Sequence, residues 1–316
     1  MLNIIVRIVF FVAALLLLWA VSRAWRVESC FLKYCGTGLA GLLFTVALLL
    51  IVLTTAGIFK LHARSATVPK IKLVGTAKQI QRGQAIASSF CDGCHSRTGP
   101  LTGGVDIGKA LAVPVGSFVS SNLTPAGQLS RWSDGEIFRA IRNGIDAKGR
   151  WLVIMSYTSA GNLSDDDIKA VIAYLRTRPA AGQPTVDPPD ELSPLGFVML
   201  GAGLLPQGKP VFGGSISAPP KGHTAEYGQY IISYQDCREC HGRDLTGGIA
   251  GQLPPIGPDL SLVKAWTLGD FVAAMRGGVD PSGRLLSDEM PWRQIGKLDD
   301  EELGAVYEYL THLPGH

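Results

Sequence analysis

Two short segments of the chain have the residue types and the spacing to hold a prosthetic group. The pentapeptide Cys-x-x-Cys-His occurs at residues 91–95 and again at residues 237–241. This is the attachment signature of c-type haem: two thiols add to the two vinyl groups of one porphyrin, and the adjacent His ligates the iron. We therefore predict two covalently bound haem c groups, attached through Cys91, Cys94, Cys237 and Cys240.

The same four cysteines could instead form two disulfides, or a zinc site of paired Cys-x-x-Cys units. Neither alternative requires a His directly after the second cysteine, and both pairs have one, His95 and His241. Of the six cysteines, only Cys30 and Cys35 lie outside the motifs. We interpret these two as ordinary reduced thiols facing the cytoplasm.

Each motif is followed by a Met at a distance suited to the other side of the haem. Met155 lies 60 residues after His95, and Met290 lies 49 residues after His241. Both are expected in loops, whereas Met275 lies inside an expected helix and is interpreted as a core residue. We predict His95 with Met155, and His241 with Met290, as axial iron ligands. A thioether ligand raises the reduction potential and fills the iron, which suits electron transfer and not substrate chemistry.

Further residues are expected close to the two haems. Pro100 and Pro258 could position backbone carbonyls against Nδ1 of the proximal His, although each could also be an ordinary turn proline. Two Trp and two Arg recur in both halves and are candidate contacts of the haem propionates. Their alternatives are domain packing for the Trp pair and surface exposure for the Arg pair. These four residues are Trp132, Trp266, Arg150 and Arg284.

The sequence around the two motifs forms an internal repeat, which indicates a duplicated domain. For example, Leu-Thr-Gly-Gly occurs at residues 101–104 and 245–248, and both Trp, both Gly-Arg pairs and both Met recur in the same order. We refer to residues 75–179 as the first repeat and to residues 221–316 as the second. A Pro/Gly-rich linker at residues 180–220 separates them.

Each repeat is expected to contain three helices. The first leads into the motif, at residues 77–90 and 225–236. The second begins with Ser133 and Glu136 as a capping box, or with Thr267 and Asp270 in the second repeat. The third begins after Ser164 or near Asp299 and shows apolar residues at helical spacing. No run of alternating residues indicates a sheet.

Charge is distributed unevenly along the chain. Residues 1–72 hold eight Lys/Arg and one acidic residue, whereas residues 73–316 hold 21 basic and 25 acidic residues. The basic excess belongs to the flanks of apolar segments. Nucleic acid is not expected as a partner, because no basic stripe with interleaved aromatic residues occurs.

The N-terminal 59 residues are predicted to be a transmembrane hairpin. Residues 36–59 carry no charge, and 24 residues are long enough to cross a hydrocarbon core of about 30 Å. Residues 3–21 are either a cleaved signal peptide or a retained first helix. The cleavage site is poor, and a retained helix places the repeats on the periplasmic side of a bacterial inner membrane, where covalent haem attachment occurs. A polar tether at residues 60–74 follows, and the apolar segment 194–206 of the linker is expected to pack on a domain or partner, or to dip toward the membrane surface.

The motifs, together with residues 121–125 (SNLTP), 132–134 (WSD), 142–146 (RNGID) and 155–157 (MSY), resemble the cytochrome c subunits of membrane-bound alcohol, aldehyde and gluconate dehydrogenases. The resemblance covers most of residues 75–316. It implies two tandem class I cytochrome c domains; with the predicted N-terminal transmembrane helical hairpin, which is not typical of those secreted subunits, the expected fold class is all-α. That family often holds three haems, and this chain has two motifs.

Together with the predicted hairpin, the resemblance implies a membrane-anchored dihaem electron carrier without a catalytic site of its own. It would pass electrons between a membrane dehydrogenase or quinol-oxidising complex and a downstream cytochrome or terminal oxidase. One alternative is an integral subunit of a larger respiratory or photosynthetic complex. Another is a dihaem enzyme of the peroxidase or thiosulfate dehydrogenase type. Redox proteins and membrane lipid are the expected partners.

Overall fold

The computed structural model describes residues 2–252 and 254–313, and within them the protein is mostly helical. The chain divides into two units, and each is described by itself. The first unit comprises residues 1–64, 106–118 and 190–207, and the second comprises residues 65–105, 119–189 and 208–316. Both haem motifs belong to the second unit.

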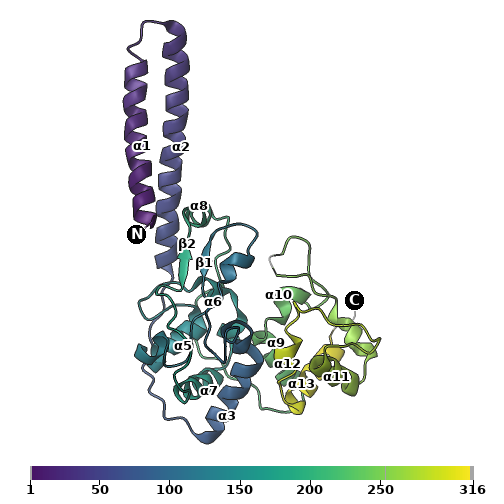
Figure 1. The fold of residues 1–316 in the computed structure, drawn as a ribbon. Helices are drawn as coiled ribbons and strands as arrows, with labels where there is room; N and C mark the ends of the chain where they lie inside the picture. Colours follow the sequence, from purple (N-terminus) through teal and green to yellow (C-terminus); the bar gives the residue numbers. More distant parts are fainter. Residues whose placement is uncertain (1, 253, 314–316) are drawn as a thin grey trace. The chain divides into compact units, whose positions relative to one another are not determined.

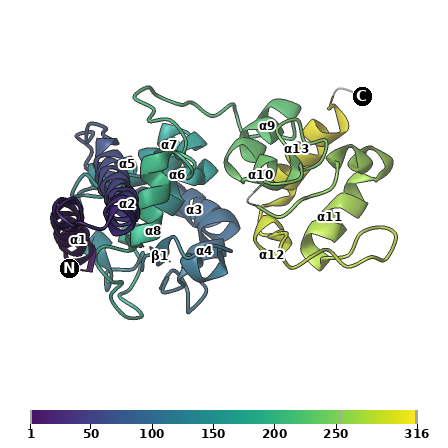
Figure 2. The same cartoon turned by 90° about the horizontal axis from the view of Figure 1, so that it is seen from above.

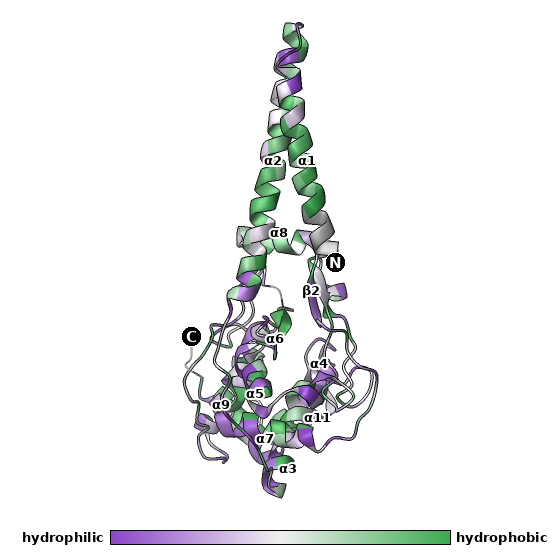
Figure 3. Cartoon of the chain, turned by 90° about the vertical axis from the view of Figure 1, so that its left-hand side faces the viewer, coloured by the Kyte–Doolittle hydropathy of each residue, from purple (hydrophilic) through white to green (hydrophobic). Residues whose placement is uncertain are grey.

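Two long helices, α1 (Leu2–Ala24) and α2 (Cys30–Ala63), run antiparallel along each other in the first unit (Figure 1). Apolar residues predominate on both helices (Figure 3). Among the described residues, α2 is the one helix that is long and apolar enough to cross a membrane, since the apolar part of α1 with described side chains, Ile8–Ala24, is shorter. Both predicted helices are present with longer bounds, but one candidate span is found where two were expected.

The remainder of the first unit includes a small sheet. Strand β1 (Gly116–Phe118) pairs antiparallel with β2 (Asp190–Leu192). The expectation that the chain has no sheet is therefore wrong, because strands of three residues are too short to show an alternating pattern. A 3₁₀ turn (Ile107–Ala110) precedes β1, and β2 leads into helix α8 (Pro194–Ala202).

Most of the first repeat lies in the second unit, while its residues 106–118 belong to the first, and its predicted helices are present. Ser133 caps the second of them in a capping box with Glu136, as predicted, and Ser164 caps the third. The first continues through a π-helical turn (Ala87–Cys91) into the motif. The helices are α3 (Ala77–Ile86), α4 (Asp92–His95), α5 (Asp134–Asn143), α6 (Val153–Tyr157) and α7 (Asp165–Arg176), with 3₁₀ turns at Gln128–Arg131 and Ser159–Asn162.

The second repeat has the same order of elements. Thr267 and Asp270 form the predicted capping box, and Asp299 with Glu302 forms another at the start of the last helix. The helices are α9 (Ala225–Tyr234), α10 (Cys237–His241), α11 (Leu268–Gly277), α12 (Trp292–Ile295) and α13 (Asp300–Thr311), with a 3₁₀ turn at Leu260–Ala265.

The first and last helices of each repeat cross at a glycine. A Cβ atom on Gly83 of α3 would lie 1.9 Å from the carbonyl oxygen of Ala170 in α7, and one on Gly228 of α9 would lie 1.9 Å from that of Ala305 in α13. Only a residue without a side chain lets two backbones approach so closely. Figure 2 shows α3 against α7 and α9 against α13. These crossings fix the helix that leads into each motif.

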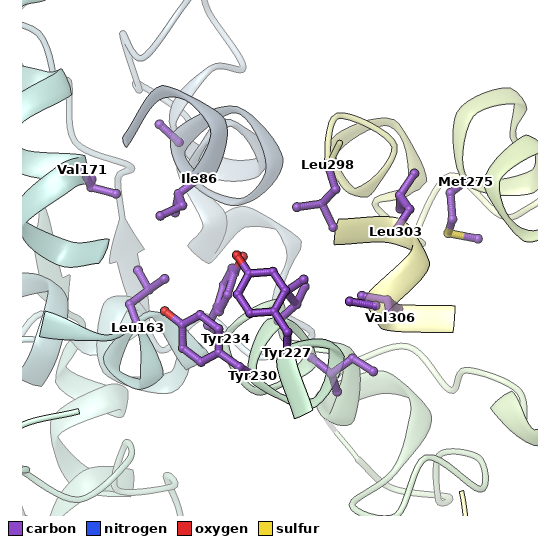
Figure 4. Packing of buried hydrophobic residues seen from close by; sticks show 14 of the residues in the cluster. Ile86, Leu163, Val171, Tyr227, Tyr230, Tyr234, Met275, Leu298, Leu303 and Val306 are labelled. Carbon is purple, nitrogen blue, oxygen red and sulfur yellow. The ribbon is translucent and has the colours of Figure 1, made fainter. Parts of the chain in front are cut away.

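One hydrophobic core joins the two repeats. It contains Ile86 of the first repeat and Leu303 of the second in a single cluster of buried side chains. Three tyrosines on one face of α9, Tyr227, Tyr230 and Tyr234, lie between them (Figure 4), with successive ring centroids 6.0 and 5.3 Å apart. The two repeats are therefore packed against each other.

A buried polar cluster lies beside these tyrosines. Arg82 of α3 donates two hydrogen bonds of 2.8 Å to Asp167 of α7 and also pairs with Glu302 of α13. The Tyr230 hydroxyl donates to Asp167 at 2.6 Å. Glu302 is only 1% exposed, so its charge depends on Arg82 for compensation. This cluster ties the first repeat to the second.

Candidate haem sites

Both motif histidines are buried and are oriented by a backbone carbonyl. They are the last residues of α4 and α10. Nδ1 of His95 donates to the carbonyl oxygen of Ser121, and Nδ1 of His241 donates to that of Pro258, each at 2.7 Å. Burial lowers the pKa of both imidazoles, which favours the neutral ring. Nε2 then keeps the electron pair that a metal ligand needs.

The carbonyl contact predicted at Pro258 is present, but the one predicted at Pro100 is wrong, because Ser121 supplies the carbonyl in the first repeat. The register of the repeat explains the difference. The N–H groups of Leu123 and Leu260 each donate to the carbonyl of the first residue of a Leu-Thr-Gly-Gly segment. The carbonyl that accepts from the motif His lies two residues earlier in both cases. Pro100 is an exposed turn residue. The residue whose carbonyl binds the motif His is thus identified by its position two residues before Leu123 or Leu260, and not by being a proline.

The second motif lies in a cavity of about 850 Å³ whose walls are mostly apolar. This volume is within the range of small-molecule and cofactor sites. The structure brings together at this cavity every residue that was predicted to contact the second haem. They are Cys237, Cys240, His241, Pro258, Trp266, Arg284 and Met290.

The methionines occupy different kinds of position. Met290 lies in the turn before α12 and lines the second cavity. Met275 of α11, a buried residue, lines the same cavity. Met155 is half-buried on the short helix α6, where a loop was expected. A helix of five residues is too short to be recognised from its apolar spacing.

The two Trp lie in different surroundings, and so do the two Arg. Trp266 lines the second cavity, and its carbonyl accepts a hydrogen bond of 2.8 Å from the Tyr307 hydroxyl. Trp132 packs against the shared core of the repeats. Arg284 also forms an ion pair with Asp280, with Nε donating to the carboxylate at 3.0 Å. Arg150 is half-buried, and its role at the first haem stays a prediction.

The first repeat contributes part of the wall of the second cavity. Ile154, Tyr157 and Thr158, on and after α6, line the cavity together with residues of the second repeat. No sequence pattern predicts this contact, because no periodicity links α6 to a motif so far along the chain. Helix α6, which carries Met155, therefore contacts the cavity of the second repeat as well as its own repeat.

Each motif is also held by a residue of the other repeat. Asp236, which precedes the second motif in a left-handed conformation with φ of 58°, accepts a hydrogen bond of 2.6 Å from the N–H of Ser159. Burial raises the pKa of this carboxyl. Lys297 of the second repeat donates to Asp92, inside the first motif, at 3.0 Å. The two attachment segments are thus fixed by contacts that cross between the repeats.

Gly257 is a site residue that sequence reasoning missed. A Cβ atom there would lie 2.7 Å from Nδ1 and 2.8 Å from Cε1 of His241. The missing side chain lets the segment before Pro258 pass directly over the imidazole. The Gly-Pro pair at residues 257–258 is the signal in the sequence that could have identified it.

The described part of the chain gives no support to the disulfide and zinc alternatives. All six cysteines are free thiols, and no group of three His, Cys, Asp or Glu side chains is placed to hold a metal ion. Burial raises the pKa of Cys91 and Cys237 to about 12, which favours their neutral thiols. Two neutral thiols on one helical turn, an imidazole with free Nε2 and an apolar cavity fit a covalently bound haem c.

Comparison with known proteins agrees with this geometry. Residues 78–175 match the family described as cytochrome C oxidase, cbb3-type, subunit III, and residues 225–314 match the family cytochrome c. The cytochrome c subunit of alcohol dehydrogenase (quinone) from Gluconobacter oxydans is 31% identical over 272 residues, which are 74% of this chain and 55% of that protein. The fructose dehydrogenase cytochrome subunit from Gluconobacter japonicus is 30% identical over 274 residues, 74% of this chain and 52% of that protein.

A third relative matches over a shorter region. The gluconate 2-dehydrogenase cytochrome c subunit from Pantoea cypripedii is 34% identical over 101 residues, 30% of this chain and 22% of that protein. The chain spans about half the length of the alcohol and fructose dehydrogenase subunits. The predicted resemblance to alcohol and gluconate dehydrogenase subunits is confirmed. The chain consists in large part of two cytochrome c domains with two covalent haem c groups, and it is homologous to the cytochrome c subunits of alcohol, fructose and gluconate dehydrogenases.

Proposed function

We propose that the chain is a membrane-anchored dihaem cytochrome c. It passes electrons on the periplasmic face between a membrane dehydrogenase or quinol-oxidising complex and a downstream cytochrome or terminal oxidase. The observation that carries this proposal is the pair of buried imidazoles, each beside two cysteines and each with Nδ1 bound to a carbonyl. Such an imidazole presents Nε2 in one fixed direction.

The proposed roles of the residues follow from their positions. Cys91 and Cys94 attach one haem, and Cys237 and Cys240 attach the other. A bound haem c supplies a one-electron Fe(III)/Fe(II) couple. His95 with Met155, and His241 with Met290, are the axial ligands. With a His and a Met bound to each iron, no position would be left for a substrate, and the sites would serve electron transfer.

The contacts between the repeats support transfer within the chain. Ile154 and Tyr157 of the first repeat line the second cavity, and Asp92 and Asp236 tie each motif to the opposite repeat. Direct packing and hydrogen bonds of this kind keep the two motifs close to each other. We propose that electrons move between the haems across these contacts.

The membrane anchor is proposed to be the whole hairpin, with both α1 and α2 in the bilayer. α1 has 23 residues and packs along α2, and the antiparallel arrangement places its N-terminus and the end of α2 at the same side. That side is proposed to be periplasmic, with the turn between the helices in the cytoplasm.

Coordination of the two irons tests the carrier function. The full-length protein in detergent should contain two haem c per chain, show the methionine–Fe(III) charge-transfer band for both, and bind no carbon monoxide after reduction. Carbon monoxide binding at either reduced haem would favour the dihaem enzyme instead.

A second candidate is an electron-transfer subunit of a larger complex. It is favoured by the names of the relatives, each of which is a cytochrome subunit of a dehydrogenase. Purification in mild detergent distinguishes the two: a stable stoichiometric partner indicates a subunit, and migration as a single chain indicates a separate carrier.

A further inference from the structure

Helix α8 of the first unit presents an apolar surface that electron transfer does not explain. No residue of Pro194–Ala202 has a charged or hydrogen-bonding side chain. One side of the helix is buried through Gly196, Phe197 and Leu200. In contrast, Leu195 is 45% exposed, and Leu204, just beyond the helix, is 68% exposed. A helix that is apolar on all sides needs an apolar surrounding.

α8 crosses α2 in direct backbone contact, as Figure 3 also shows. A Cβ atom on Gly57 of α2 would lie 2.1 Å from the carbonyl oxygen of Phe197, and one on Gly201 would lie 1.9 Å from the carbonyl oxygen of Leu53. Small residues at such crossings are typical of helices that pack inside membranes. The contact holds α8 at a defined height along α2.

Lys60 shows where this crossing lies relative to the end of the uncharged segment of α2. It is the first charged residue after the uncharged segment of α2, and its Nζ donates to the carbonyls of Leu200 and Gly201, each at 3.0 Å. The crossing at Gly57 lies three residues earlier, or about 4.5 Å along the helix. Interfacial helices lie about 5–10 Å inside the boundary between headgroups and acyl chains, so this height fits one.

The apolar surface extends beyond α8. Leu111 and Val113, in the segment before β1, are exposed. The same segment touches the start of α8, because a Cβ atom on Gly196 would lie 2.0 Å from the carbonyl oxygen of Val115. Exposed apolar side chains thus extend from α8 to the segment before β1.

We propose that α8 is an interfacial membrane helix, embedded at the headgroup boundary of the bilayer that α2 spans. The inference rests on the proposed membrane anchor and adds a third membrane-bound element, located in the linker between the two cytochrome domains. Lipid is the occupant of the exposed face because that face continues the apolar surface of α2 and offers no polar side chain to a protein partner.

Spin labels on the full-length haem-loaded protein test this. Leu195→Cys and Leu204→Cys are made separately in a background of Cys30→Ser and Cys35→Ser, labelled with a nitroxide and reconstituted in phosphatidylcholine liposomes. Accessibility to oxygen and to a neutral nickel chelate is measured with both haems oxidised, because a reductant that keeps the haems as Fe(II) would also reduce the nitroxide and consume the oxygen. Val46→Cys in the middle of α2 and Lys78→Cys in α3 serve as lipid and water references, and the haem-to-protein ratio shows that each variant is folded.

The expected result is that labels at both α8 positions, like the label at residue 46, contact oxygen at least several-fold more than nickel chelate. If residue 46 is in lipid but the α8 labels are reached by nickel chelate, this inference is overturned and the anchor stands. Low accessibility to both reagents would indicate that a protein surface covers α8, and would also overturn it. A label at residue 46 in water would refute the anchor itself, and the inference with it.

Discussion

At the scale of single residues, main-chain atoms orient the two proximal imidazoles. Ser121 and Pro258 have different side chains, yet their carbonyls make the same 2.7 Å hydrogen bond to Nδ1 of the motif His. Side-chain substitutions at these two positions are therefore tolerated as long as the backbone path is kept. Changes that displace the backbone are not.

Gly257→Ala is expected to disturb the second haem selectively. The new methyl group would overlap the ring of His241, which then has to turn away from its carbonyl partner. We expect a loss of axial ligation and a shifted reduction potential at one of the two haems, measured by spectroelectrochemical titration. Gly269→Ala on α11 is the matched control, since its Cβ would meet no atom closer than 3.7 Å. Equal effects of the two variants would contradict the assigned role.

Met290→Ala distinguishes the two methionines of the second cavity. Loss of the axial thioether should remove about half of the methionine–Fe(III) charge-transfer band and lower the potential of one haem, because a thioether favours Fe(II). Met275→Leu keeps the volume of a core residue and should leave the band unchanged. The opposite pattern would make Met275 the ligand.

At the scale of elements, the turn between α1 and α2 carries a natural reporter of topology. Cys30 and Cys35 are exposed at the start of α2, and the other four cysteines are the haem-attachment sites. A membrane-impermeant maleimide should therefore label inverted vesicles and leave intact spheroplasts unlabelled. Labelling from the periplasmic side would contradict the proposed hairpin topology.

Elements with local signals were predictable, and those built from distant contacts were not. Ser133 with Glu136 and Thr267 with Asp270 identify helix starts because a capping box is contained in four residues. The β1–β2 pairing depends on segments that lie far apart in the chain, and each strand is too short to show a pattern. The motif residues were predictable for the same reason as the caps. Ser121, and the lining of the second cavity by Tyr157, required the tertiary structure.

At the scale of the whole molecule, the shared core leads us to expect that the two cytochrome domains unfold as one unit. Arg82→Met would leave Asp167 and Glu302 as buried carboxylates without their cation. Breaking a buried pair in this way costs about 3–5 kcal/mol of unfolding free energy. Urea unfolding, followed through the haem absorbance and through circular dichroism, should shift as one transition.

Arg293→Met provides the control, because the ion pair of Arg293 with Asp288 is exposed on both sides. Its loss should change the unfolding free energy by less than about 1 kcal/mol. Two separate transitions in the wild-type protein would show that the repeats fold independently.

The path of the backbone between the two units has a consequence for how the cytochrome part is held. In the described residues the chain passes between the units five times, because residues 106–118 and 190–207 return to the unit that contains α2. A protease that cuts once within residues 65–74 would therefore not release a soluble haem fragment, since α8 stays packed on α2. In the proposed membrane-anchored protein, the cytochrome domains are therefore connected to α2 by several segments of the chain and not by residues 65–74 alone.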